Sequence, residues 1–148
     1  MSERKIYHTT VCPIGTETVS EIKKTNKKWG SEHLVKNDTY CVKIMTLESG
    51  TKVSLHYHLR KEETFVLLSG KLLVEVVDGS KGENKKIFLQ IMGDSLTLKP
   101  GTAHTFYCPE GQIEPTVFIE ASTQDFIDDS YRIYPSKGKD ADSGRSDS

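Results

Sequence analysis

The chain has 148 residues, of which 20 are Lys or Arg and 21 are Asp or Glu, so its formal net charge is -1. This length favours one domain with a substantial core, and the charge, without a basic stripe interleaved with aromatic residues, argues against a nucleic-acid partner. No apolar run approaches the roughly 18 residues of a membrane span, and the N-terminus lacks the apolar stretch of a secretory signal. We therefore expect a cytoplasmic protein with neither a nucleic-acid nor a membrane partner.

The first 28 residues are polar and mixed, and we expect an irregular N-terminal extension there. From about Tyr40 onward, short β-branched and apolar runs alternate with turns rich in Gly, Pro and Asp. The expected strands are Tyr40–Leu47, Lys52–His58, Thr64–Leu68, Lys71–Val77, Ile87–Met92, Ser95–Leu98, His104–Cys108 and Thr116–Glu120. This pattern predicts an all-β fold, and a closed barrel or jelly roll is favoured because closure removes exposed sheet edges. The tail, residues 136–148, has no hydrophobic anchor and is predicted to be disordered.

Three histidines and a carboxylate have the spacing of a metal site. In a strand, side chains two residues apart point the same way, so His56 and His58 can present two imidazoles to one ion. Glu62 or Glu63 follows, and His104 comes directly after a Pro-Gly turn. Three neutral imidazoles and one carboxylate suit one divalent transition metal, namely Mn, Fe(II), Co, Ni or Zn. Polarity alone leaves the choice between the two glutamates open.

The same residues resemble the two motifs of the cupin superfamily. The first motif, G-x5-H-x-H-x3-4-E-x6-G, is matched by Gly50, His56, His58, Glu63 and Gly70. The second is matched by Gly93, Gly101 and His104, with Lys99 in place of a Pro and Cys108 in place of an Asn. The resemblance implies a single cupin jelly-roll barrel, a double-stranded β-helix. It also implies that the metal ligands are His56, His58, Glu63 and His104, and it makes Cys108 a candidate for lining the pocket.

A narrower resemblance is to type II phosphomannose isomerase-like cupins. It is carried by Trp29-Gly30-Ser31-Glu32, by Tyr40-Cys41-Val42-Lys43 and by the Gly93 to His104 segment. The resemblance implies a cupin domain over residues 29–135, a homodimer, and a place in carbohydrate metabolism as a mannose-6-phosphate isomerase-like enzyme acting on a sugar or sugar phosphate.

Aldose-ketose isomerisation needs a metal that holds the carbonyl and the adjacent hydroxyl, and a base that moves a proton between neighbouring carbons. No base can be named from the sequence. A substrate phosphate would need a cation, and the candidates are Lys43, which carries the family resemblance, and Arg60, which shares the face of His56 and His58 if the strand extends that far. Two alternatives stay open: a non-haem Fe(II) dioxygenase, which uses the same ligand set, and a non-catalytic module that binds a sugar or another small molecule.

Overall fold

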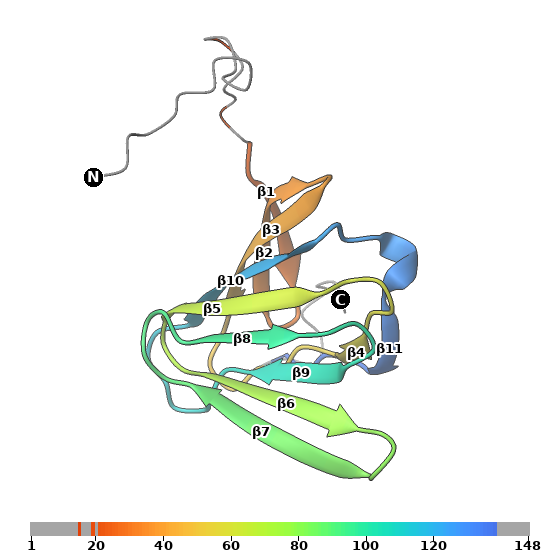
Figure 1. The fold of residues 1–148 in the computed structure, drawn as a ribbon. Helices are drawn as coiled ribbons and strands as arrows, with labels where there is room; N and C mark the ends of the chain where they lie inside the picture. Colours follow the sequence, from red (N-terminus) through yellow and green to blue (C-terminus); the bar gives the residue numbers. More distant parts are fainter. Residues whose placement is uncertain (1–14, 16–18, 20, 139–148) are drawn as a thin grey trace, which may run out of the picture.

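The protein, described here from a computed structural model, is nearly all β (Figure 1). The structure describes residues 15, 19 and 21–138. Within them, eleven strands form two antiparallel sheets, and the helical structure is a single 3₁₀ turn at Ile127–Asp129. No helix in this part of the chain is long and apolar enough to cross a membrane. The predicted all-β jelly roll is confirmed.

After the first three strands, which belong to one sheet, the chain passes repeatedly between the two sheets, so each sheet combines distant segments. The six-stranded sheet has the order β1 (Lys23–Lys27), β2 (Gly30–Asn37), β3 (Tyr40–Leu47), β10 (Thr116–Thr123), β5 (Glu63–Ser69), β8 (Ser95–Leu98). The five-stranded sheet has the order β11 (Tyr131–Tyr134), β4 (Leu55–Tyr57), β9 (Ala103–Tyr107), β6 (Leu72–Asp78), β7 (Glu83–Leu89).

Period-two burial along the central strands builds the core between the sheets. In β5 every second residue from Glu63 to Leu67 is buried, and in β10 the same holds from Thr116 to Glu120. Because successive side chains of a strand point to opposite faces, one face of each strand is inside. The rings of Phe65, Phe106 and Phe118 meet there with centroids 4.5–5.9 Å apart. This aromatic cluster lies beneath His104, whose ring centroid is 5.2 Å from that of Phe106.

The paired structure begins earlier than the sequence suggested. Residues 23–27, inside the predicted irregular extension 1–28, form β1 and pair with β2 through the register Lys27↔Gly30. This strand is the edge of its sheet, where lysines are common because they discourage further strand pairing. Its lysines at 23 and 24 are exposed, but Lys27 is buried. The rest of the predicted extension, apart from residues 15, 19, 21, 22 and 28, lies outside the described residues.

The C-terminal end and one hairpin also differ from the prediction. Lys137, in the predicted disordered tail, exchanges two backbone hydrogen bonds of 2.9 Å with Lys52, so paired structure continues past residue 135. The predicted disorder of residues 139–148 lies outside the described residues. The strand expected at Ile87–Met92 is instead Glu83–Leu89, because the hairpin with β6 turns tightly after Asp78 and pairs it with Glu83.

Candidate metal centre and its cavity

The three histidines of the sequence motifs meet at one point between neighbouring strands. His56 lies on β4, His58 follows that strand, and His104 lies on β9, where its backbone is directly opposite that of His56. Opposed residues of an antiparallel pair share a face of the sheet. The ring centroid of His56 is 5.1 Å from that of His58 and 4.6 Å from that of His104. One ligand atom from each ring lies within 4.8 Å of the other two, so the three residues could hold a metal ion.

Main-chain carbonyl groups fix the orientation of all three rings. Each Nδ1 atom donates to one carbonyl oxygen: His56 to Ser54 at 2.7 Å, His58 to Asp129 at 2.8 Å and His104 to Thr102 at 2.8 Å. A carbonyl oxygen only accepts, so the proton of a neutral ring is on Nδ1 and the lone pair is on Nε2. The Nε2 atoms of His58 and His104 are buried without a hydrogen-bond partner in the part of the chain that the structure describes. A metal ion accepts such lone pairs, and the Nδ1 contacts are those that usually orient metal-bound histidines.

Glu63 is the carboxylate that faces these rings. Its Oε2 lies 3.2 Å from His104 Nε2, and its Oε1 lies 3.4 Å from His58 Nε2. A carboxylate oxygen and a nitrogen lone pair repel each other at this distance unless a proton or a cation lies between them. Glu62, by contrast, points to the surface and pairs with Lys99. The alternation of β5 therefore places Glu63 inside and Glu62 outside.

The surroundings favour the neutral forms of His56 and His58 and the ionised form of Glu63. Burial, together with the nearby His104, lowers the pKa of His56 to about 3. Burial and the charge of Lys61 also lower the pKa of His58. For Glu63, burial alone opposes ionisation, but His104 and Lys61 outweigh it and lower the pKa. Neutral imidazoles and an anionic carboxylate are the forms that bind a metal.

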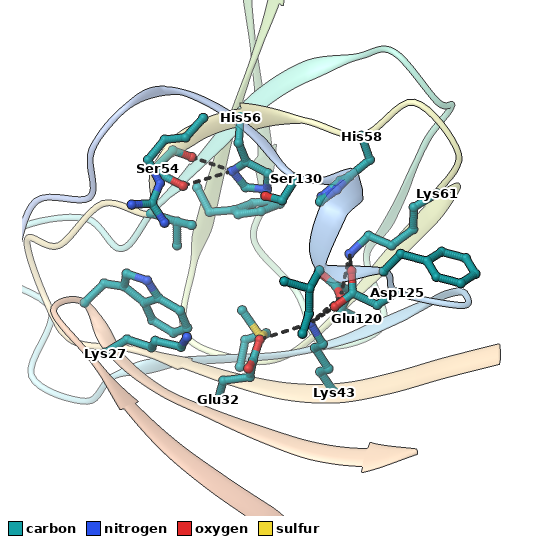
Figure 2. A pocket seen from close by; sticks show the side chains of 17 residues that line it. Lys27, Glu32, Lys43, Ser54, His56, His58, Lys61, Glu120, Asp125 and Ser130 are labelled. Carbon is teal, nitrogen blue, oxygen red and sulfur yellow. Dashed lines mark hydrogen bonds and ion pairs between the residues drawn. The ribbon is translucent and has the colours of Figure 1, made fainter. Parts of the chain in front are cut away.

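A buried ion-pair network adjoins the histidines (Figure 2). Two ammonium groups each contact three carboxylates. Lys61 Nζ lies 2.9 Å from Glu63, 3.1 Å from Asp125 and 3.4 Å from Glu120. Lys43 Nζ lies 2.8 Å from Asp125, 3.2 Å from Glu32 and 3.9 Å from Glu120. Burial alone would lower the pKa of Lys61, but Glu120 and Glu63 raise it. Both lysines therefore remain charged inside the barrel, where unpaired charges would be costly.

A cavity of about 290 Å³ connects the histidines with this network. His56 and His58 line one wall, and Lys61, Glu120 and Asp125 line another (Figure 2). This volume lies just below the range of about 300–1,000 Å³ for ligand pockets, which fits a small polar metabolite. The lining includes the apolar Trp29, Met45, Val53, Phe106, Phe126 and Ile127.

Of the two cations expected to bind substrate, the structure places one in the cavity and one outside it. Lys43 lines the cavity but is held by the carboxylates of the network. Arg60 is exposed, pairs with Asp128 at 2.6 Å and is not among the lining residues. The reason is that β4 ends at Tyr57 and the chain bends, with the Asp129 carboxylate accepting hydrogen bonds from the backbone N–H groups of residues 59 and 60. The face shared by His56 and His58 therefore does not continue to Arg60.

Cys108, expected to line the pocket, lies elsewhere in the core. It is buried, with its Sγ 3.3 Å from Thr116 Oγ1 and 3.5 Å from Gln112 Nε2, and it does not line the cavity. At roughly 3.3 Å per strand residue, four residues separate it from His104 by about 13 Å. Cys108 is therefore inside the same barrel as His104, but too far along the chain to reach the histidines.

Several polar residues that line the cavity were not predicted as site residues. They are Lys27, Glu32, Ser54, Lys61, Glu120, Asp125, Ser130 and Arg132. A signal existed for Glu120, because Thr116, Phe118 and Glu120 alternate in one strand and share its inner face. For the others, the chain turns that bring them to the cavity are not visible in a local pattern.

The two-sheet barrel, with three convergent histidines beside an inward carboxylate, defines a cupin. The sequence matches the family described as Mannose-6-phosphate isomerase C-terminal over residues 15–133. The chain therefore belongs to this family, as its motifs indicated. No curated protein matches the chain in sequence.

Solved structures agree on the fold. The capsular polysaccharide assembling protein CapF from Staphylococcus aureus matches 81% of this chain and 36% of its own, with a TM-score of 0.69 and 17% identity. Oxalate decarboxylase from Bacillus subtilis matches 79% of this chain and 33% of its own, with a TM-score of 0.64 and 20% identity. Another structure of that decarboxylase concerns its Mn(II) centres. This chain spans about a third of the length of these solved chains, and at such identity the likeness establishes the fold alone.

Proposed function

We propose that this protein is a metal-dependent isomerase of a small sugar or sugar phosphate. The observation that carries the proposal is the convergence of His56, His58, His104 and Glu63 beside a small cavity that also contains the buried carboxylate Glu120. The family match to the C-terminal part of mannose-6-phosphate isomerase supports the reaction class. The cytoplasmic location and the homodimer remain predictions.

The proposed metal ligands are His56, His58, Glu63 and His104. The charge of the neighbouring network supports a divalent ion there, because its four carboxylates outnumber its two ammonium groups by two when all are ionised. The ligand set suits Mn, Fe(II), Co, Ni or Zn. A divalent ion in this position supplies a Lewis acid for a substrate carbonyl and its neighbouring hydroxyl.

Glu120 is the proposed proton-transfer group. It lines the cavity from β10, is buried, and lies 3.4 Å from Lys61 and 3.9 Å from Lys43. Burial, as the largest influence, raises the pKa of Glu120, although both lysines act in the opposite direction. A carboxyl group with a raised pKa gives up and recovers a proton more readily near neutral pH than an exposed one. Glu120 can therefore take a proton from one carbon and return it to the next.

The remaining lining fits a polyol. Asp125, Ser130 and Ser54 offer polar groups to hydroxyls, while Trp29 and Phe106 give the apolar surface against which the C–H bonds of a sugar pack. The small volume of the cavity limits the water that enters with a ligand, which strengthens electrostatic interactions inside it.

The test is an isomerase screen on hexose phosphates and free pentoses with the protein loaded separately with each candidate metal. We expect turnover with at least one metal. Glu120→Gln should lose at least about 100-fold of that turnover, as expected for a general acid-base group, while keeping its metal. Full activity of Glu120→Gln would remove that residue from the mechanism.

Two other results would replace the proposed function. Fe(II)-dependent oxygen uptake without isomerisation would identify a dioxygenase. Tight ligand binding without turnover under any metal would identify a non-catalytic binding module.

A further inference from the structure

The chain passes from the six-stranded sheet to the five-stranded sheet through residues 124–130, which we call the crossing segment (Figure 1). This segment follows β10, contains the 3₁₀ turn Ile127–Asp129 and leads into β11. Three of its side chains, those of Phe126, Ile127 and Ser130, line the cavity. The crossing segment therefore forms part of the cavity wall as well as connecting the sheets.

The start of the crossing segment is fixed by Asp125. Its main-chain N–H donates to Asn37 Oδ1, and its carbonyl accepts from Asn37 Nδ2, both at 2.9 Å. Its carboxylate lies 2.8 Å from Lys43 Nζ and 3.1 Å from Lys61 Nζ. This end of the segment is thus held by β2, β3 and the ion-pair network, without a contact to the histidines.

The far end of the crossing segment is fixed by Asp129, which is 1% exposed and holds the chain around His58 at two points. Its main-chain carbonyl accepts from His58 Nδ1 at 2.8 Å. Its carboxylate accepts from the main-chain N–H of Leu59 at 2.9 Å and from that of Arg60 at 3.1 Å and 3.2 Å. One residue therefore fixes both the ring of a candidate metal ligand and the main chain directly after it.

His58 depends on this distant contact more than the other two histidines do. His56 and His104 lie in paired strands, and each ring bonds to the carbonyl of the residue two positions earlier. His58 comes after β4 has ended, and the carbonyl that holds its ring is 71 positions away in the sequence. The main-chain carbonyl of His58 accepts from the N–H of Gly101, but that contact leaves the ring free to rotate about its side-chain bonds.

We propose that Asp129 is a positioning residue for the metal site, which holds the ring of His58 toward the other two histidines and ties its orientation to the crossing segment. The proposal rests on the metal site of the proposed function. Metal binding should therefore stabilise the crossing segment, and loosening this segment should weaken metal binding, because such coupling is reciprocal. Altering the groups that orient metal-bound histidines costs about 10–100-fold in metal affinity.

The test is Asp129→Asn, with the affinity for Co(II) and Zn(II) measured by competition with a chelating dye. The amide keeps the shape of the side chain but replaces one acceptor by a donor that faces main-chain N–H groups. We expect a loss of about 10–100-fold in affinity. At saturating Co(II), the absorption spectrum of the bound ion should also differ from that of the wild type, because it follows the coordination geometry. A loss of stability alone would not change that spectrum.

Two control variants separate positioning from charge and from stability. Asp128→Asn removes the same charge one residue away, from a side chain that is 82% exposed and pairs with Arg60 at the surface. Thr116→Val removes a buried hydrogen bond to the carbonyl of Lys71, and Thr116 does not line the cavity. Both variants should keep the wild-type affinity and Co(II) spectrum.

Hydrogen exchange of the wild-type protein tests the coupling without any substitution, so the test stays decisive if Asp129→Asn does not fold. The amides of residues 125–134 should exchange more slowly with Zn(II) than with a chelator, because the metal fixes His58 and His58 fixes Asp129.

Wild-type affinity and spectrum in Asp129→Asn, an equal loss in either control, or exchange that does not respond to Zn(II) would overturn the positioning role. A wild-type protein that binds neither metal would overturn it together with the metal site. Turnover is measured separately. The expected affinities without isomerase activity would keep the positioning role and reject the proposed function, whereas an active isomerase whose metal affinity is unchanged in Asp129→Asn would do the reverse.

Discussion

Lys61 Nζ lies 2.9 Å from Glu63 Oε1, so the carboxylate oxygen that faces His58 is also in contact with a buried ammonium group. The same ammonium contacts Asp125 and Glu120. Lys61 therefore links the proposed metal site to the proposed proton-transfer group, and its positive charge is needed by three carboxylates at once. Lys61 thus contributes both to the stability of the barrel and to the charge of the site.

Lys61→Met should destabilise the metal-free protein strongly. Removing one partner of a buried ion pair typically costs about 3–5 kcal/mol, because the opposite charge is left without compensation. Urea unfolding in the presence of a chelator measures this change in the free energy of unfolding. Lys99→Met, which removes an exposed pair with Glu62, is the control and should have little effect. Equal effects of the two substitutions would show that the network carries no special share of stability.

His104→Ala should abolish stoichiometric metal binding while the barrel stays folded. Changing residues that only orient a metal ligand costs about 10–100-fold in affinity, and the loss of a direct ligand should cost at least as much. Glu63→Gln should also reduce metal content, whereas Glu62→Gln should not, because Glu62 points to the surface. Elemental analysis of the purified variants gives the metal-to-protein ratio. Unchanged metal content in His104→Ala would reject this residue as a ligand.

The sequence predicted best the strands in which alternation is strong. Tyr40–Leu47 and Ser95–Leu98 occur with the predicted bounds. The prediction missed β2 and β11, which carry many polar or exposed residues and are held by long-range pairing. The ring of Tyr131 in β11 stacks on Tyr57 at 5.0 Å, a contact between residues 74 positions apart in the sequence. Such strands cannot be recognised from a local pattern because distant partners stabilise them.

The residues of the site also fall into those that the sequence could predict and those that it could not. The histidines could be predicted because a strand imposes a spacing on side chains that share a face. The cations of the cavity could not, since Lys27 lies in a lysine-rich edge strand and Arg132 in a short exposed strand, and each resembles an ordinary surface residue. Arg60 was predicted to lie in the cavity but does not, because the strand ends before it and the side chains no longer alternate where the chain bends.

Acid should destabilise the metal-free protein over the range in which unfolded histidines titrate. The pKa of His56 is about 3 in the folded chain, against about 6.5 in an unfolded one. Below pH 6.5 the unfolded chain therefore binds a proton that the folded chain does not, and stability falls until the pH approaches the folded value, by at most about 1.4 kcal/mol per pH unit for this group. Urea unfolding with a chelator between about pH 7 and 5.5, above most of the usual titration of Glu near pH 4.3, measures the slope.

The matched variant for this measurement is His56→Gln, which cannot take up the proton. Its stability should depend less steeply on pH than that of the wild type, with a remaining slope from His58, whose pKa is also lowered. Identical slopes in the two proteins would show that His56 is protonated equally in the folded and unfolded chains.

Gly30→Ala should destabilise the hairpin that carries Lys27 and Trp29 to the cavity. Gly30 has φ +149°, and an added Cβ would lie 1.9 Å from the carbonyl oxygen of Thr46 on the neighbouring strand. Backbone strain of about 1–3 kcal/mol adds to an overpacking cost of about 1–3 kcal/mol, so we expect a loss of several kcal/mol in the free energy of unfolding. Gly79→Ala, in a turn where an added Cβ meets nothing within 4 Å, should change stability by less than about 0.5 kcal/mol. Similar unfolding midpoints for the two variants would contradict the close approach of β2 to β3.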